Sequence, residues 1–219
     1  MIGILLLICA QMIMASDFPV INDQDSFESD LHSAALINQL PNLKGGDHYL
    51  GLKISTLAIN SPNGQFVPVP EVRLSIYPNP GYNMWANFAK WPGDSPTFSY
   101  GTGVQVAFYG ENVQSEQAIG FTWSMITGEW YQQRDIKIHG MFSRVLDKWE
   151  YGLIALLDLH HVIAEKNLGV NSYDGTIMQI APYIKLMNWD AYNLSLMVPL
   201  SKDGGAISLS LEHFLGKRD

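Results

Sequence analysis

Residues 97–109, TFSYGTGVQVAFY, alternate between two kinds of side chain. Bulky apolar residues occupy alternate positions, and small or polar residues lie between them. The bulky set is Phe98, Tyr100, Val104, Val106 and Phe108. Because successive side chains of a β-strand point to opposite faces, this stretch predicts a strand with one bulky apolar face and one small, polar face.

The same alternation recurs from His48 onward, in segments of about ten residues, the strand length typical of membrane barrels. The predicted strands are 48–59, 66–77, 82–91, 97–109, 117–126, 134–145, 149–160, 176–187, 191–200 and 204–214. Short turn-rich connections separate them, which favours antiparallel neighbours. The expected fold class is therefore all-β, an antiparallel barrel of about ten strands, with about eight to twelve allowed.

Two kinds of barrel fit this alternation, and they differ in the direction of the apolar face. A soluble lipocalin-like ligand-binding barrel turns that face inward, whereas a transmembrane barrel turns it toward lipid. The apolar face carries Leu50, Leu52, Val72, Leu74, Met84, Phe88, Val104, Phe121, Trp123, Ile136, Ile138, Leu153, Leu157, Ile180, Ile184, Leu194, Leu196 and Leu209. This volume is too large for one small interior, so the sequence favours the transmembrane barrel. The secreted lipocalin-like barrel stays open as an alternative.

Aromatic residues gather near both sets of predicted strand ends, as expected for belts at two membrane interfaces. One set is Tyr49, Tyr77, Tyr82, Phe108, Tyr109, Trp149, Tyr151, Trp189, Tyr192 and Phe214. The other is Phe66, Trp91, Phe98, Tyr100, Trp123, Trp130, Tyr131 and Tyr173. Pro78-Asn79-Pro80-Gly81, Leu146-Asp147-Lys148 and Asn188-Trp189-Asp190 are predicted as tight turns on the first side.

Over residues 48–214 the chain resembles the bacterial outer-membrane β-barrel class. Lys202-Asp-Gly-Gly-Ala-Ile-Ser-Leu209 is similar to the insertion signal of that class, although Phe214 is followed by Leu-Gly-Lys-Arg-Asp instead of ending the chain. The resemblance implies export across the inner membrane and residence in the outer membrane. The implied partners are outer-membrane lipid, the barrel-insertion machinery and small polar solutes.

The segment before the barrel has two predicted parts. Residues 1–15, MIGILLLICAQMIMA, predict a signal peptide, and residues 16–46 a periplasmic or plug segment ahead of a barrel over 47–219. Within 16–46, Asp25 and Glu28 resemble a capping box at the start of a short helix. Its apolar face would hold Phe27, Leu31, Ala35, Leu36 and Leu40.

Composition excludes several functions. The net charge is −8, and the thirteen Lys and Arg residues are spread singly, so nucleic acid is not an expected partner. Cys9, the single cysteine, lies in the predicted leader. The mature chain would therefore have no disulfide, thiol catalysis or cysteine-based zinc site.

Charged residues also occur on the inward parity of the strands. The cations are Lys53, Arg73, Lys137 and Lys185, and the anions are Glu71, Glu150, Asp158 and Glu212. Because unpaired charges away from water are costly, this balance predicts a structural network that fills the lumen. A narrow pore that selects ions or small polar solutes is the other interpretation. A wall of small residues around Gly103 and Gly120 is expected to leave room for a channel or a plug.

His139 and His160 are predicted rim histidines near Asp158. An Asp and a His that activate water at an outer rim resemble the omptin proteases, so a barrel hydrolase using Asp158, His160 and His139 is an alternative function. The chain lacks the long outer strands and paired aspartates of that family. The leading hypothesis is a non-enzymatic barrel without cofactor. No metal site is expected, because His160 and His161 point to opposite faces and spacing supplies no third ligand.

Overall fold

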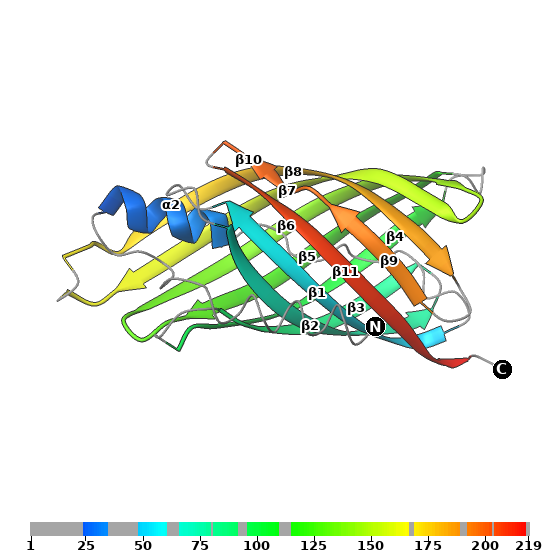
Figure 1. Cartoon of the computed structure of the whole chain (residues 1–219), viewed down its shortest axis with the longest axis horizontal. Coiled ribbons are helices and arrows are strands. Elements are labelled where there is room, and N and C mark those ends of the chain that lie inside the picture. The colour runs from blue at the N-terminus through cyan, green and yellow to red at the C-terminus, as the bar shows by residue number, and fades with distance from the viewer. Residues whose placement is uncertain are drawn as a thin grey trace.

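The computed structural model describes residues 24–34, 48–60, 66–79, 81–91, 96–109, 115–166, 169–188, 192–202 and 204–217. The strands form one antiparallel sheet in which sequence neighbours pair (Figure 1). The first and last strands pair with each other from His48↔Lys217 to Ile59↔Ala206, which closes the sheet into a barrel. Closure leaves no free sheet edge between the first and last strands.

The strands match the ten predicted segments in order. They are β1 His48–Asn60, β2 Phe66–Asn79, β3 Tyr82–Lys90, β4 Phe98–Tyr109, β5 Ser115–Thr127, β6 Tyr131–Leu146, β7 Trp149–Ala164, β8 Tyr173–Asn188, β9 Tyr192–Met197, β10 Leu200–Ser201 and β11 Gly204–Lys217. Both β9 and β10 pair with β8 on one side and β11 on the other. They are therefore two pieces of one barrel strand, and the predicted ten-stranded barrel is confirmed.

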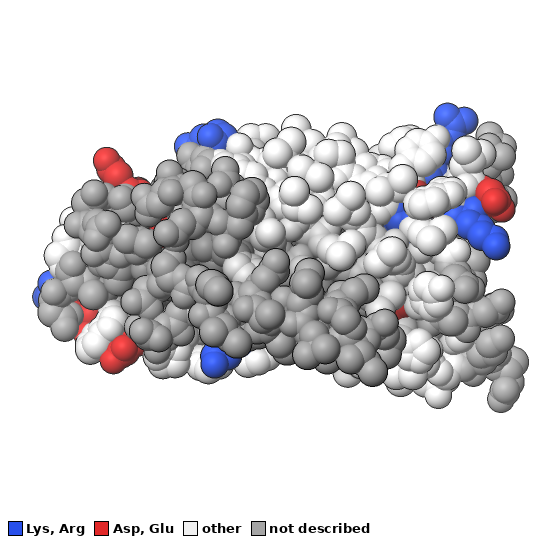
Figure 2. Space-filling view, in the orientation of Figure 1, with Lys and Arg blue, Asp and Glu red and all other residues white. Residues whose placement is uncertain are grey.

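The predicted orientation of the two faces is also confirmed. Bulky apolar side chains are exposed on the outside, such as Leu74 (46%), Phe121 (45%) and Ile180 (53%). Polar and charged residues of the same strands are buried inside. On the visible surface, charged side chains lie toward the two ends of the barrel, and the described surface between them carries none (Figure 2). The exterior is thus suited to lipid along the middle of the barrel.

Strands β6, β7 and β8 are longer than predicted. The expected connections 127–133 and 163–175 shorten to 128–130 and 165–172, because residues 131–133, 161–164 and 173–175 continue the ladder. The alternation near these ends is weak, so the sequence did not mark them as strand. They remain paired because Tyr131 and Val162 pack in the apolar cluster at this end of the barrel.

The backbone conformation explains the predicted tight turn between β6 and β7. Leu146 pairs with Trp149 across Asp147 and Lys148, and Asp147 has a φ of 54°. A two-residue hairpin of this kind needs positive φ, which Asp tolerates better than most residues. Of the other two predicted turns, Pro80 and residues 189–191 lie outside the described residues.

A short helix, α2 (Gln24–Ala34), precedes the barrel. The helix begins at Gln24, so Asp25 lies inside the first turn and not at the predicted N-cap. Glu28 Oε1 accepts a hydrogen bond from Gln24 Nε2 at 2.5 Å. Phe27 and Leu31 are fully buried, as expected for the apolar face. Ala35, Leu36, Leu40 and the predicted signal peptide lie outside the described residues.

No helix among the described residues is both long and apolar enough to cross a membrane.

Glycines on the inner wall make room for large side chains, and this gives a first prediction. A Cβ on Gly120 would collide with the ring of His139 and lie 2.9 Å from the carbonyl oxygen of Val104. Gly120→Ala is therefore expected to destabilise the barrel by about 1–3 kcal/mol. Gly140→Ala is the matched control, because no atom lies within 4 Å of its Cβ. Urea unfolding in lipid vesicles measures both, and equal effects would contradict the prediction.

Candidate functional site: the barrel lumen

All eight predicted lumen charges lie on the inner face of the barrel. Seven are buried to 7% exposure or less, and the Lys137 side chain is 12% exposed. The sequence does not show which cation pairs with which anion. In the structure, the ion pairs form between residues directly opposite each other on neighbouring strands.

The Lys185–Glu150 pair is the tightest of these contacts. The two residues are cross-strand partners on β8 and β7, with Lys185 Nζ 2.5 Å from Glu150 Oε2. Tyr183 donates a hydrogen bond from its hydroxyl to Glu150 Oε1 at 2.7 Å. Each carboxylate oxygen of Glu150 therefore contacts a polar partner. A charged pair this deep is stable only when its remaining hydrogen-bonding positions are also satisfied.

A second pair joins the first and last strands. Lys53 on β1 lies opposite Glu212 on β11, with Lys53 Nζ 3.8 Å from Glu212 Oε2. Tyr77 donates from its hydroxyl to Glu212 Oε1 at 2.7 Å. The arrangement repeats that of Glu150, with a lysine and a tyrosine on one buried glutamate. Lys53 is also the cross-strand partner of Arg73, which extends the network onto β2.

Arg73 and the small-residue wall are linked by an aromatic side chain. The Arg73 guanidinium carbon lies 4.8 Å from the centroid of the Trp85 ring, a cation–π distance. A Cβ on Gly103 would collide with that ring. The space expected beside the wall is thus occupied by Trp85 and, beside Gly120, by His139. Trp85 was not among the predicted lumen residues, although its position in the alternation of β3 places it on the inner face.

His139 lies at the middle of β6, which differs from its expected rim position. It is 1% exposed, and its Nε2 lies 3.1 Å from Gln105 Oε1. His160 lies four residues from the end of β7 and is 4% exposed. It is closer to the end of the barrel at which β1 finishes. Because His139 pairs with Leu156 across the strands, it lies deeper in the barrel than His160.

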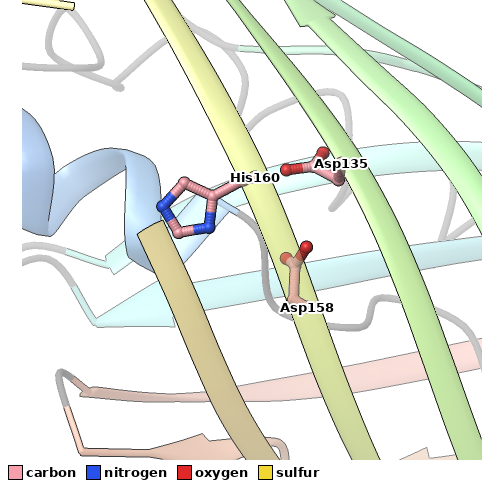
Figure 3. Close-up of side chains that lie close together, drawn as sticks. All are labelled: Asp135, Asp158 and His160. Atoms are coloured by element: carbon pink, nitrogen blue, oxygen red, sulfur yellow. The ribbon is translucent and has the colours of Figure 1, made fainter. Parts of the chain in front are cut away.

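Asp135, which was not among the predicted site residues, lies beside Asp158 and His160. Asp135 on β6 is the cross-strand partner of His160, and Asp158 lies two positions before His160 on the same face of β7. One ligand atom from each of the three residues lies within 4.8 Å of the others. Figure 3 shows the three side chains around a common space on β6 and β7. Asp135, and not His139, completes this group.

Helix α2 packs against the strand ends at the mouth of the barrel, the end at which β1 finishes. Phe27 contacts Tyr131 edge to face, with ring centroids 5.6 Å apart. Phe27 and Leu31 belong to an apolar cluster with residues at the ends of seven strands and in the β7–β8 connection: Leu57, Ile59, Val69, Ala89, Trp91, Ile126, Tyr131, Val162, Val170 and Ala206. Gln24 adds hydrogen bonds to the backbone of Asn171. This is the end where β1 finishes, opposite His48.

Comparisons with known proteins show likeness in fold only. No protein-family model matches the chain, and no curated protein matches it in sequence. Among solved structures, the KdgM porin is 7% identical with a TM-score of 0.44, covering 76% of this chain and 99% of that one. The autotransporter NalP translocator domain from Neisseria meningitidis is 11% identical with a TM-score of 0.44, covering 88% and 98%.

The N-terminal β-barrel domain of Pseudomonas aeruginosa OprF is 6% identical with a TM-score of 0.36, covering 78% and 99%. These values are too low to transfer any property to this chain. The architecture therefore rests on the chain's own geometry, with an even number of antiparallel strands, an apolar exterior and a polar interior. The chain has the fold of the outer-membrane-type transmembrane β-barrel.

Proposed function

We propose that this protein is a non-enzymatic barrel of the bacterial outer membrane whose lumen is closed. The observation that carries the proposal is the burial of the ion pairs. Lys53, Glu212, Lys185 and Glu150 are each 1–2% exposed. A channel wide enough for water would leave its lining side chains accessible. A closed lumen therefore accounts for these residues better than an ion-selective pore.

The mouth supports the same proposal. The apolar cluster of Phe27 and Leu31 with the strand ends covers the lumen above the ion pairs. We assign α2 the role of a plug, which is one of the two roles open to residues 16–46. The lumen is thus closed at two depths, first by apolar packing and then by paired charges.

The two alternative functions have less support. A lipocalin-like barrel needs an apolar interior and a polar exterior, and the observed orientation is the reverse. The hydrolase alternative needs His139 beside Asp158 and His160, but its ring lies against Gln105 and Trp85. Export and insertion by the barrel machinery stay predictions from the resemblance.

Planar-bilayer recording of the refolded full chain tests the closed lumen. We expect no conductance steps above background, because the buried ion pairs leave no continuous aqueous path. Heat-modifiable migration of the same sample in detergent shows that the barrel has folded. The variant Phe27→Ser is expected to stay silent as well, because the Lys185–Glu150 and Lys53–Glu212 pairs lie below the mouth. Reproducible steps from the wild-type barrel would favour the narrow-pore interpretation instead.

A further inference from the structure

The Asp135, Asp158 and His160 group has the composition and geometry of a metal site. Antiparallel pairing places Asp135 opposite His160, and the two-residue period of β7 places Asp158 on the same inner face. In Figure 3 the Asp158 carboxylate points toward the space between Asp135 and His160. The three residues are 0–4% exposed. Three potential ligands from two adjacent strands therefore converge inside the wall of the barrel.

Asp158 supplies an independent observation that points to a ligand. Its side chain is completely buried, and neither of its carboxylate oxygens makes a hydrogen bond with any residue that the structure describes. Among the described residues it forms one ion pair, with Lys137, whose Nζ lies 3.9 Å from Oδ2 and is too distant for a hydrogen bond. Glu150 and Glu212 each accept a hydrogen bond from a tyrosine, but Asp158 accepts none from the described residues. Its oxygens are thus buried and free to bind a ligand.

Asp135 is held in place by neighbouring groups. Gln133 Nε2 donates to Asp135 Oδ1 at 2.6 Å, and Ser124 Oγ donates to Asp135 Oδ2 at 3.0 Å. Hydrogen bonds from outer groups orient metal-binding carboxylates in this way. Each carboxylate oxygen still has a second lone pair for a metal ion. The Asp135 carboxylate is therefore positioned before any ligand binds.

We propose that Asp135, Asp158 and His160 bind a first-row divalent cation such as Zn²⁺ or Mn²⁺. One imidazole and two carboxylates suit these ions, whereas Mg²⁺ and Ca²⁺ prefer oxygen ligands alone. Ligand atoms around a tetrahedral Zn²⁺ lie about 3.4 Å apart, given bonds of about 2.1 Å. The observed limit of 4.8 Å needs only small side-chain rotations to reach that spacing. Two carboxylates also outweigh the single positive charge of Lys137.

The site lies directly below the plug helix. Tyr131, which contacts Phe27, precedes Asp135 by two inward positions on β6. The His160 ring meets the Tyr173 ring edge to face at 5.8 Å, and Tyr173 packs against the apolar cluster of the mouth. A bound ion would therefore tie β6 and β7 together beneath α2. The inference does not depend on whether the lumen conducts.

Zn²⁺ binding by the refolded, untagged full chain tests the site. The barrel is refolded with and without Zn²⁺, dialysed, and analysed for bound metal and for the temperature at which heat-modifiable migration is lost. We expect one tightly bound Zn²⁺ per chain and a higher transition temperature with Zn²⁺. The same protocol with Mg²⁺ is expected to give neither. A wild-type barrel that retains no Zn²⁺ would overturn the proposal.

Variants distinguish this site from other histidines. Asp158→Asn and His160→Gln are expected to lose the bound Zn²⁺ and the shift in transition temperature. His161→Gln is the matched control, because His161 is the next residue but lies outside, with its Nδ1 2.6 Å from Asp174 Oδ1. It is expected to bind Zn²⁺ like the wild type. Zn²⁺ retained by Asp158→Asn, or lost from His161→Gln, would contradict the assignment.

Lys137→Met tests the site through a gain in Zn²⁺ affinity, which a barrel that has failed to fold does not show. Removing this competing cation is expected to tighten Zn²⁺ binding about tenfold, because Lys137 repels the ion from Asp158. A purely structural Lys137–Asp158 pair predicts no such gain. Unchanged or weaker Zn²⁺ affinity in a folded Lys137→Met barrel would overturn the proposed site.

Discussion

Lys185→Met is expected to destabilise the barrel by about 3–5 kcal/mol, the largest effect of any single change considered. The substitution keeps most of the side-chain volume but removes the ammonium group that contacts Glu150 Oε2. Glu150, 2% exposed, would then be a buried carboxylate with only the Tyr183 hydroxyl as a described hydrogen-bond donor. Urea unfolding of the refolded barrel in lipid vesicles measures the loss.

A double variant separates the cost of an uncompensated charge from the net value of the pair. Lys185→Met combined with Glu150→Gln leaves no charge at this position and keeps an acceptor for Tyr183. It is expected to recover most of the lost stability, because neutral replacement of a buried pair is often close to neutral. Lys202→Met, at an exposed position, is the control for loss of a lysine alone. A double variant as unstable as Lys185→Met would refute the explanation.

Ile138→Arg is expected to cost about 2–4 kcal/mol in a lipid bilayer. Ile138 lies near the middle of β6, points outward and is 45% exposed. In a membrane barrel this position faces the centre of the hydrocarbon layer, where an arginine is poorly solvated. Urea unfolding in vesicles, compared with the wild type, gives the difference in stability.

Leu146→Arg introduces the same charge on the outer face of the same strand at a different depth, and is the control for depth. Leu146 is the last residue of β6, beside the Asp147-Lys148 turn, and is 66% exposed. Near the membrane interface the same charge is expected to cost only about 0–1 kcal/mol. If both variants unfolded like the wild type, the outer face would not be in contact with lipid. This comparison thus tests the membrane placement independently of the lumen.

The candidate site was predictable as a set of residues but not as a set of contacts. Alternation placed Asp158 and Glu150 on the inner face, because parity within a strand is a local property. The partner of each residue depends on the register between strands. A shift of one residue changes every cross-strand pair. Asp135 has the same inward parity as Lys137 and His139, but only the β6–β7 register shows that it lies opposite His160.

The ends of the strands were harder to predict than their middles. His139 was expected at the rim but lies in the middle of β6, and its place within the predicted strand 134–145 already indicated this depth. β6 itself begins at Tyr131, three residues earlier than predicted. The extra residues are strand because they pair with β7 and support the apolar cluster around Phe27. Such packing involves α2, which is separated from β6 by about a hundred residues of sequence.

The sequence by itself determined the number of strands and their inward and outward faces, because these follow from a two-residue period. The tertiary structure alone decided which lysine meets which carboxylate, where α2 lies and that Asp135, Asp158 and His160 converge. Those features depend on contacts between strands and between distant segments. A local pattern sets the face of a side chain, but only the closed barrel sets its neighbours.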